Sequence, residues 1–571
     1  MKNEKTINNV LNLAKNDSSQ LEVIRNDSKK IVVEAPAGFG KTFTMINMIK
    51  YWIITGVITN YKKVLCLSFS VSAANRMKES IESSFIKDND KRLLRVIKAT
   101  NFHGLCRTIL SKYGFLVGLD VKKVYQNMDS SDKKTLSLLP KGERKVIIDL
   151  DTSIKAASIS SNGLIKKIKN YNNITRTYFL TQNKLPYNSI ITLTLELLID
   201  NNQICEFYQK YFTAICIDEF QDTNILGLTL IKLLTGKNTR FVAFGDDMQQ
   251  IYQFLGAIPS LIDKYSEDSN VKYLTLQNNY RFKNNIEMQL LDCQLRRYKE
   301  TLNTEGYTRV SLNTIHGKDL SDEALKISEF IKKHSTYKCA VLFSNNSKTT
   351  KCLVKYLLNE EITPFNALFR DDDQSVIDFH DIALKIYFEM YRSHPITNKE
   401  VTNYIKKVEK STSKTDYKQS LLLLLKALIK KSIKEYSRDN RSEFISTILS
   451  SYSLRQNLVD VKHNIILSTI HGAKGLEWDY VILANFEYNE LPNYFEIKAI
   501  GNINKNSKLV PNTENKKDIQ DFINKFYVAF SRSKKEFIVS YSDMHWEGCR
   551  YNQASISPIA KLPFIEIKEI K

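Results

Sequence analysis

The stretch Ala35-Pro-Ala-Gly-Phe-Gly-Lys-Thr42 places the strongest constraint on the fold of this chain. It follows Ile31-Val-Val-Glu34, an apolar run typical of a buried strand, and it precedes Phe43–Lys50, which has the pattern of a helix. A strand, a glycine-rich turn and a helix in that order form a phosphate cradle, because backbone N–H groups and the positive end of the helix converge on one point. Ala35 stands where the strict phosphate-loop pattern has its first glycine.

The residue types within this loop suggest how a nucleoside triphosphate is held. Gly38 and Gly40 let the backbone approach the phosphates, Lys41 can reach the β- and γ-phosphates, and the Thr42 hydroxyl can ligate Mg²⁺. We therefore expect ATP and Mg²⁺ to bind here. The expected loop contacts to ATP come from Ala37, Gly38, Phe39, Gly40, Lys41, Thr42 and Phe43.

A second acidic element follows another apolar run. Tyr211–Ile217 is typical of a buried parallel strand, and it ends at Asp218-Glu-Phe-Gln-Asp222. Carboxylates at the tip of such a strand suit phosphoryl transfer, because Asp218 can hold Mg²⁺ and Glu219 can orient or deprotonate the attacking water. In a doubly wound sheet these strand ends line the ligand crevice. The two elements together predict an α/β fold with a nucleotide site.

Further short motifs follow in order along the chain. They are Gly245–Ala257, Leu276–Phe282, Ile465–Glu477 and Phe526–Arg532. With the phosphate loop and the acidic strand end, they make the chain resemble superfamily 1 DNA helicases of the UvrD, Rep and PcrA type. Ile217–Thr223 is closer to the RecB and AddA version of its motif. The resemblance covers nearly the whole chain and implies two RecA-like P-loop NTPase domains, each with a mainly helical insertion.

Position and composition predict how the chain divides. The stretch after Tyr113 is helical and rich in lysine, and the stretch after Asp373 is helical and rich in Lys, Ser and Leu. The leucine run Leu421–Leu425 is expected to be a buried helix rather than a partner-binding surface. After the strand Phe537–Tyr541 we expect no nuclease domain of the RecB kind. The expected parts are motor domain 1A (1–112 and 200–283), insertion 1B (113–199), motor domain 2A (284–372 and 460–571) and a reduced insertion 2B (373–459).

The resemblance implies which side chains bind the adenosine. Gln20 would read the adenine edge, Tyr280 would stack on the base and Glu477 would bind the ribose. Phe43 stands where the family usually has an arginine that stacks on the base, so base selectivity is an open question here.

The resemblance also implies the catalytic side chains. Gln249 falls on the glutamine that senses the γ-phosphate, and Arg281 and Arg532 fall on two arginine fingers, which stabilise charge that develops in the transition state. Lys41 and Glu219 complete this expected set.

A third group implied by the resemblance contacts single-stranded DNA. Its expected members are Phe69, Phe102, His103, Tyr252, Phe254, Thr469 and His471. Phe254 replaces the usual tryptophan, and it can still stack because every base has a π-face. Core packing is the alternative role for Phe69 and Phe102, and an ordinary surface histidine is the alternative for His103.

Composition narrows the partners and the compartment. The net charge of +21 and the pI near 9.3 favour a polyanion such as nucleic acid, although lysine-rich translation of an A/T-rich genome would give the same bias. The eight cysteines include no C-x-x-C pair, which argues against a zinc or iron–sulfur site. The polar start and the lack of a run of about 18 apolar residues predict a cytoplasmic protein without a membrane span.

The sequence therefore predicts an ATP-dependent translocase on single-stranded DNA and 3′–5′ helicase, acting on single strands or tailed duplexes. Since 2B regulates unwinding in relatives and is short here, translocation is the firmer expectation. Two alternatives remain open. One is a motor or sensor subunit of an antiphage defence complex, similar to the helicase-like subunit of Gabija systems, that activates a partner nuclease. The other is a DNA-gated ATPase switch without net unwinding.

Overall fold

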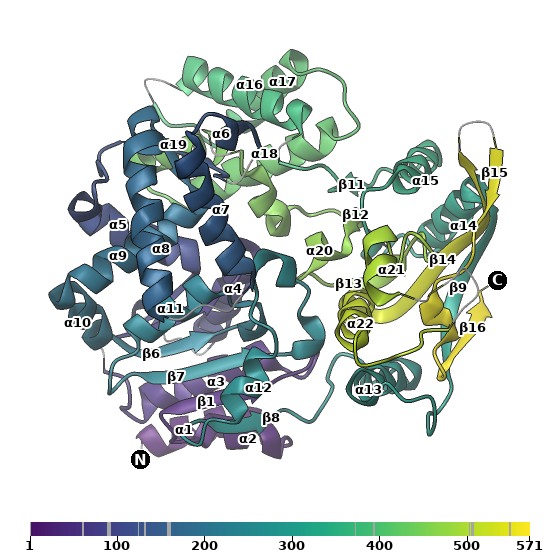
Figure 1. Ribbon diagram of the computed structural model, residues 1–571, viewed down its shortest axis with the longest axis horizontal. Helices are drawn as coiled ribbons and strands as arrows, with labels where there is room; N and C mark the ends of the chain where they lie inside the picture. Colours follow the sequence, from purple (N-terminus) through teal and green to yellow (C-terminus); the bar gives the residue numbers. More distant parts are fainter. Residues whose placement is uncertain are drawn as a thin grey trace. The chain divides into compact units, whose positions relative to one another are not determined.

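The computed structural model describes residues 2–59, 62–87, 93–123, 125–130, 133–156, 161–371, 373–391, 394–450, 452–501, 503, 508–547 and 550–570. These residues form two compact units, Met1–Asn279 and Tyr280–Lys571, called unit 1 and unit 2 below. Each unit contains one large, mainly parallel sheet covered by helices (Figure 1). The predicted α/β class is therefore confirmed.

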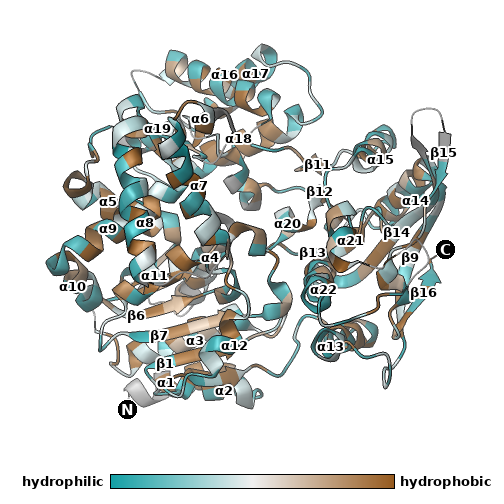
Figure 2. Ribbon diagram, viewed as in Figure 1, coloured by the Kyte–Doolittle hydropathy of each residue, from teal (hydrophilic) through white to brown (hydrophobic). Residues whose placement is uncertain are grey.

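The sheet of unit 1 has the strand order β3-β2-β6-β7-β1-β8, and all its strands are parallel. Its strands are β1 (Lys30–Glu34), β2 (Lys63–Ser68), β3 (Ile97–Asn101), β6 (Phe212–Ile217), β7 (Arg240–Gly245) and β8 (Lys272–Thr275). The central strands are hydrophobic along most of their length, as Figure 2 shows for β6 and β7. Such runs are typical of parallel strands buried on both faces.

Helices cover both faces of this sheet. Side chains alternate between the two faces of a strand, so Ile31 and Val33 belong to one core and Val32 belongs to the other. The first core includes α2 (Ser18–Arg25), α3 (Lys41–Ile54) and α4 (Val71–Lys87), and the second includes α5 (Phe102–Tyr113), α9 (Tyr187–Asp200) and α11 (Ile225–Leu234). The remaining helices outside the stretch 113–199 are α1 (Lys2–Leu13), α10 (Asn202–Tyr211) and α12 (Leu261–Ser266).

The stretch between β3 and β6 is mostly helical, in line with its sequence pattern. It contains α6 (Lys133–Ser137), α7 (Lys141–Ala156), α8 (Ser161–Ile174), a π-helical turn (Thr175–Phe179) and the short parallel pair β4 (Gln126–Met128) and β5 (Lys184–Pro186). Helix α9, at the end of the predicted insertion, packs on α5 and α11. It therefore contributes to the same core as the sheet, although it lies within the predicted 113–199 insertion.

The sheet of unit 2 has the order β11-β12-β10-β13-β14-β9-β16, with β15 antiparallel to β14. The strands are β9 (Val310–Asp319), β10 (Cys339–Phe343), β11 (Phe365–Asn366), β12 (Ile465–Thr469), β13 (Trp478–Leu483), β14 (Ser533–Glu547), β15 (Arg550–Gln553) and β16 (Ile565–Glu569). The helices beside it are α13 (Ile286–Thr301), α14 (Leu320–Lys333), α15 (Lys348–Asn359), α20 (Ile470–Ala473), α21 (Tyr494–Ile500) and α22 (Lys516–Phe530). Two strands that the sequence analysis did not predict, β15 and β16, follow β14.

A purely helical segment lies between β11 and β12. It contains α16 (Gln374–Tyr391), α17 (Val401–Ser411), α18 (Lys418–Glu435), α19 (Arg438–Ser450) and the 3-10 turn Leu454–Asp460. Four of the five residues in Leu421–Leu425 are buried within α18, which confirms the prediction of a buried helix. Among the described residues, no helix is both long and apolar enough to cross a membrane.

Candidate active site

The phosphate loop of unit 1 has the backbone that its glycines predict. Gly38 and Gly40 have φ angles of 87° and 81°, in the left-handed region where a side chain is disfavoured. Gly40 caps α3, which begins at Lys41 directly after the loop. The N-terminus of this 14-residue helix therefore lies close to the carboxyl end of β1. This arrangement binds phosphate through backbone N–H groups.

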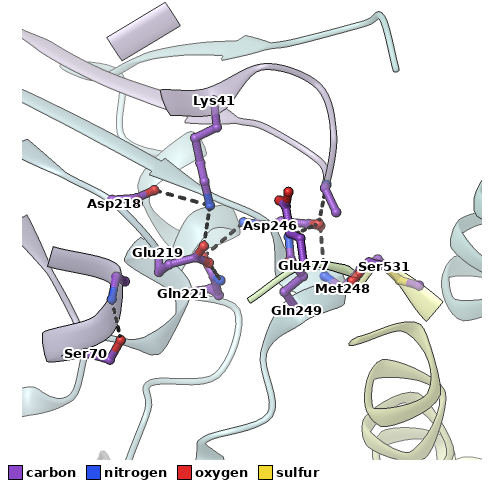
Figure 3. A network of polar contacts seen from close by, with 12 residues as sticks. Lys41, Ser70, Asp218, Glu219, Gln221, Asp246, Met248, Gln249, Glu477 and Ser531 are labelled. Atoms are coloured by element: carbon purple, nitrogen blue, oxygen red, sulfur yellow. Dashed lines mark hydrogen bonds and ion pairs between the residues drawn. The ribbon is translucent and has the colours of Figure 1, made fainter. Parts of the chain in front are cut away.

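Lys41 lies between the two carboxylates that end β6 (Figure 3). Its Nζ is 2.7 Å from Glu219 Oε1 and 3.3 Å from Asp218 Oδ1. Burial alone would lower the pKa of Lys41, but the charges of Asp218 and Glu219 outweigh it and raise the pKa above its usual value. Lys41 is therefore a permanent cation at this point, available for a γ-phosphate.

The two carboxylates sit at a strained turn. Burial raises the pKa of Asp218, even though the charge of Lys41 opposes this shift. Glu219 has a φ of 59°, a conformation that non-glycine residues rarely adopt and that is concentrated at functional sites. At this turn the Glu219 carboxylate contacts the Lys41 ammonium.

Two further side chains, which the sequence analysis did not select, complete the polar network. Gln221 donates from Nε2 to Glu219 Oε2 at 2.6 Å, and its Oε1 accepts the N–H of Asp246 at 3.0 Å. Asp246 Oδ2 in turn accepts from the Ala37 N–H at 3.2 Å and from Gln249 Nε2 at 2.8 Å (Figure 3). Asp246 thus ties the phosphate loop to Gln249, the predicted γ-phosphate sensor.

The donor set suits Mg²⁺ when a nucleotide supplies the rest of the coordination. Mg²⁺ prefers oxygen ligands and is usually held by one or two protein groups together with substrate phosphates and water. Thr42 supplies a hydroxyl in the first turn of α3, and Asp218 supplies a carboxylate at the end of β6. The described residues contain no cluster of three or more His, Cys, Asp or Glu side chains that could hold a metal by itself.

Two predicted adenosine contacts lie beside the loop. Asp17 caps α2 by accepting the N–H of Gln20 at 3.0 Å, and this buries Gln20 against the loop. The Gln20 amide then donates to the Phe39 carbonyl at 3.4 Å. Phe43 is 40% exposed, so its ring is open for contact with a base.

Three of the remaining predicted residues, Arg281, Glu477 and Arg532, lie in unit 2. The Arg281 guanidinium donates to Glu477 Oε1 and to the carbonyl of Ser531, the residue before Arg532. Glu477 also pairs with Lys534 at 3.3 Å. Arg532 is 4% exposed and donates to the Val528 carbonyl at 3.0 Å and to the Ser531 hydroxyl at 2.8 Å.

These contacts hold both guanidinium groups in fixed positions. Tyr280, directly before Arg281, is 45% exposed and leaves its ring accessible for stacking. Trp478 is buried, so it packs in the interior of unit 2.

Three of the predicted DNA-contacting aromatics come together in unit 1. Phe69 and Tyr252 are stacked with ring centroids 5.1 Å apart, and Tyr252 and Phe254 are 6.2 Å apart. Phe254 is 58% exposed. We call these three rings the aromatic ladder. Phe69 and Tyr252 are partly buried and stacked on each other, whereas the Phe254 ring is tilted by 59° from Tyr252 and is the exposed end at which a base could stack.

Phe102 and His103 have different surroundings. Phe102 is 6% exposed and belongs to the core, as the packing alternative expects. Burial, helped by the charge of Arg107, lowers the pKa of His103 to about 4, so its imidazole is neutral at pH 7. The partly exposed His103 lies edge-on to Tyr187, with ring centroids 6.5 Å apart.

In unit 2, Thr469 and His471 lie where β12 runs into α20. The Thr469 hydroxyl caps this short helix by accepting the Gly472 N–H at 3.0 Å. The cap leaves one helical turn between Thr469 and Lys474, with His471 partly exposed on it. The turn is therefore fixed at the carboxyl end of β12.

Comparison with known proteins agrees with this geometry. Residues 16–270 match the family model of the UvrD/REP helicase N-terminal domain, and residues 380–544 match that of the UvrD-like helicase C-terminal domain. A probable DNA helicase II homolog of Mycoplasma genitalium is 23% identical over 94% of this chain and 85% of its own length. The ATP-dependent DNA helicase Rep of Buchnera aphidicola is 23% identical over 92% of this chain and 91% of its own. The PcrA helicase of Staphylococcus epidermidis is 24% identical over 85% and 80%. Its two large sheets are the central sheets of the two RecA-like P-loop domains of a UvrD-type helicase. The chain therefore belongs to the UvrD/Rep/PcrA type of helicase.

Proposed function

We propose that this enzyme is an ATP-dependent motor that moves 3′→5′ along single-stranded DNA and separates tailed duplexes. The observation that carries the proposal is the position of Lys41 between Asp218 and Glu219, directly after a phosphate loop. The stacked aromatics Phe69 and Tyr252 in the same unit supply a surface for single strands. Relatives named as ATP-dependent DNA helicases support the same reading.

In the proposed mechanism, the phosphates of ATP replace Glu219 as the ion-pair partner of Lys41. The ammonium turns to the β- and γ-phosphates, which frees Glu219 Oε1 to accept a proton from the attacking water. Gln221 keeps the other oxygen of Glu219 in place, so the carboxylate stays oriented when Lys41 leaves. Gln249 is linked to the loop by two hydrogen bonds that share Asp246 as acceptor, and it can respond to the γ-phosphate.

Mg²⁺ would be held by Thr42 and Asp218 and would neutralise charge on the phosphate oxygens. Arg281 and Arg532 act as arginine fingers in this proposal, with Glu477 as the ribose contact. We further propose the division into 1A, 1B, 2A and 2B given above. Gln20, Phe43 and Tyr280 bind the adenine.

The first test compares ATP hydrolysis by the wild type and Glu219→Gln, with and without an oligothymidylate single strand. Glutamine keeps the shape of the side chain but cannot take the proton. We expect strong stimulation by DNA in the wild type and a loss of kcat of at least about 100-fold in the variant, with ATP still bound. Equal hydrolysis by both proteins would contradict the proposed role of Glu219.

The second test separates a motor from a DNA-gated switch. Streptavidin is bound to a biotin at either the 5′ or the 3′ end of the oligonucleotide, and its release is followed with ATP. A 3′→5′ motor displaces the block at the 5′ end faster. DNA-stimulated hydrolysis without displacement from either end would favour the switch, and faster release from the 3′ end would reverse the polarity.

A further inference from the structure

A cavity of about 650 Å³ lies in unit 1 at the edge of the sheet where the strands begin. Its lining includes Lys29 and Lys30 before and at the start of β1, Thr239 and Phe241 at the start of β7, and Val271 before β8. Helices α11 and α12 provide the other walls. Its volume is in the range of cavities that bind ligands.

Lysines dominate the rim of this cavity. Five of them line it, from three separate parts of the chain: Lys29, Lys30, Lys232, Lys237 and Lys264. Asp268 is the only acidic residue in the lining, and Asn270 donates to its carboxylate from both the backbone and the side chain, at 2.9 and 3.0 Å. Within the described part of the chain, none of the five ammonium groups lies within 4 Å of a carboxylate oxygen. Lys29 Nζ donates to the Lys237 carbonyl at 3.4 Å, and the hydrogen bonds from Asn270 together with the charge of Lys30 lower the pKa of Asp268. The rim therefore sets five positive charges against one carboxylate.

The floor of the cavity is apolar. Ile231, Phe241 and Val271 are buried there. The Tyr265 ring meets Phe220 edge-on at 5.1 Å and lies 6.0 Å from Phe241. Ile231, Phe241 and Val271 are at most 8% exposed, so the floor offers only a small hydrophobic surface beside the partly exposed Tyr265, whose ring packs on Phe220.

We propose that this cavity binds an acidic peptide segment of a partner protein, with carboxylates on the lysine rim and an apolar side chain on the floor. The lysine ammonium groups are point charges that bind carboxylates and phosphates alike, and this lining has no arginine fork for bidentate phosphate binding. Single-stranded nucleic acid would need an open ring face for stacking, and the rings here are packed. Charge and apolar surface together favour a peptide.

The cavity lies at the opposite edge of the sheet from the phosphate loop. β1 runs from Lys30 at the cavity to Glu34 before the loop, and five residues of strand span roughly 15 Å. An occupant would therefore leave the ATP site open. The inference goes beyond the proposed motor function and assigns a docking site that would bring the motor to a partner.

The test measures fluorescence anisotropy with a fluorescein-labelled peptide of four aspartates followed by leucine and phenylalanine. The variant is Lys232→Glu/Lys237→Glu/Lys264→Glu, and a second variant replaces the same lysines by glutamine. The matched control is Lys122→Glu/Lys145→Glu/Lys166→Glu, which changes the net charge equally at exposed positions of unit 1 outside the cavity. Basal ATP hydrolysis, which needs none of these lysines, checks that every variant is folded.

We expect the wild type and the control to bind the peptide alike, and the charge-reversal variant to bind at least about tenfold more weakly. The glutamine variant should be intermediate. Peptides with serine in place of the aspartates, or in place of leucine and phenylalanine, should also bind more weakly. Absence of binding, equal loss in the control, indifference to the apolar residues, or displacement of the peptide by an oligothymidylate strand would each overturn the proposal.

Discussion

At the residue scale, the phosphate loop was predictable because its residues are contiguous and its glycines allow backbone angles that other residues rarely adopt. Gly38 and Gly40 have the positive φ angles that their pattern requires. Gln221 and Asp246 were not predictable in the same way. Their hydrogen bonds depend on the strand order β6-β7-β1, which brings the ends of three separate strands together.

Gln221 should be needed for chemistry more than for ATP binding. It fixes Glu219 and accepts the Asp246 N–H, but it makes no bond to the phosphate loop itself. We expect Gln221→Leu to lower kcat by about tenfold or more, with a smaller change in KM for ATP, because the catalytic carboxylate loses its orientation. Steady-state kinetics tests this, with the exposed Gln203→Leu as the matched control. A variant that changed only KM would argue for a binding role.

Glu323 should make the stability of the protein depend on pH. It is fully buried on α14, and burial, followed by the charge of Glu487, raises its pKa to about 8. Its Oε1 accepts from the Ser540 hydroxyl at 2.7 Å, and the nearby Glu487 pairs with His545 at 2.5 Å. Because the folded protein keeps this proton and the unfolded chain releases it near pH 4.5, stability should fall as the pH rises from 4.5 through about 8.

Glu323→Gln copies the neutral acid and should remove this part of the pH dependence. Between pH 6 and pH 8.5 we expect the variant to lose less unfolding free energy than the wild type, by on the order of 1–2 kcal/mol. Urea unfolding at both pH values measures it. Glu329→Gln, an exposed position on the same helix, should behave like the wild type. A parallel pH dependence in wild type and Glu323→Gln would mean that this group does not titrate in that range.

At the element scale, the strands expected at 31–34 and 211–217 match β1 and β6 to within one residue, whereas the strand expected at Phe537–Tyr541 covers only the middle of β14, Ser533–Glu547. Tyr211, expected in a strand, ends α10, and β6 begins at Phe212. The sequence analysis did not identify β3, β8, β9, β13, β15 or β16, nor the short pair β4 and β5. β16 alternates apolar and charged residues at the edge of its sheet and is only partly buried, so it lacks the continuous apolar run by which central parallel strands were recognised.

The loop that carries Tyr252 and Phe254 should depend on α7. It ends at Gly256, which has a φ of +89°, and a Cβ there would lie 2.6 Å from the Ile154 carbonyl of α7. We expect Gly256→Ala to push the aromatic loop away from the helix and to weaken stimulation of ATP hydrolysis by single strands severalfold. Basal hydrolysis should change less, because the atoms nearest the added Cβ belong to Ile154 of α7.

Gly142→Ala is the matched control for that experiment. Gly142 lies on α7 itself, and an added Cβ there would have no atom within 4 Å. It should leave the stimulation unchanged. Equal stimulation in Gly256→Ala and wild type would show that the loop does not need its contact with the helix.

At the scale of the whole molecule, the charge of +21 and the aromatic ladder predict two separable parts of DNA affinity. Phosphate contacts release counterions, so affinity for an oligothymidylate strand should fall steeply with salt, with a slope of about −0.7 per phosphate contact on a log–log plot. Stacking of a base on Phe254 releases no counterions. Phe254→Ala should therefore lower the affinity by roughly tenfold at every salt concentration and leave the slope unchanged.

Anisotropy titrations from 50 to about 300 mM salt distinguish the two parts. Lys122→Glu/Lys145→Glu/Lys166→Glu tests whether the general positive charge of unit 1 contributes, because it would then reduce the slope. If Phe254→Ala changed the slope instead of the intercept, the ring would be positioning basic side chains rather than stacking on a base. If it changed neither, the exposed ring would have no part in DNA binding, and the ladder of Phe69 and Tyr252 would have to end at another residue.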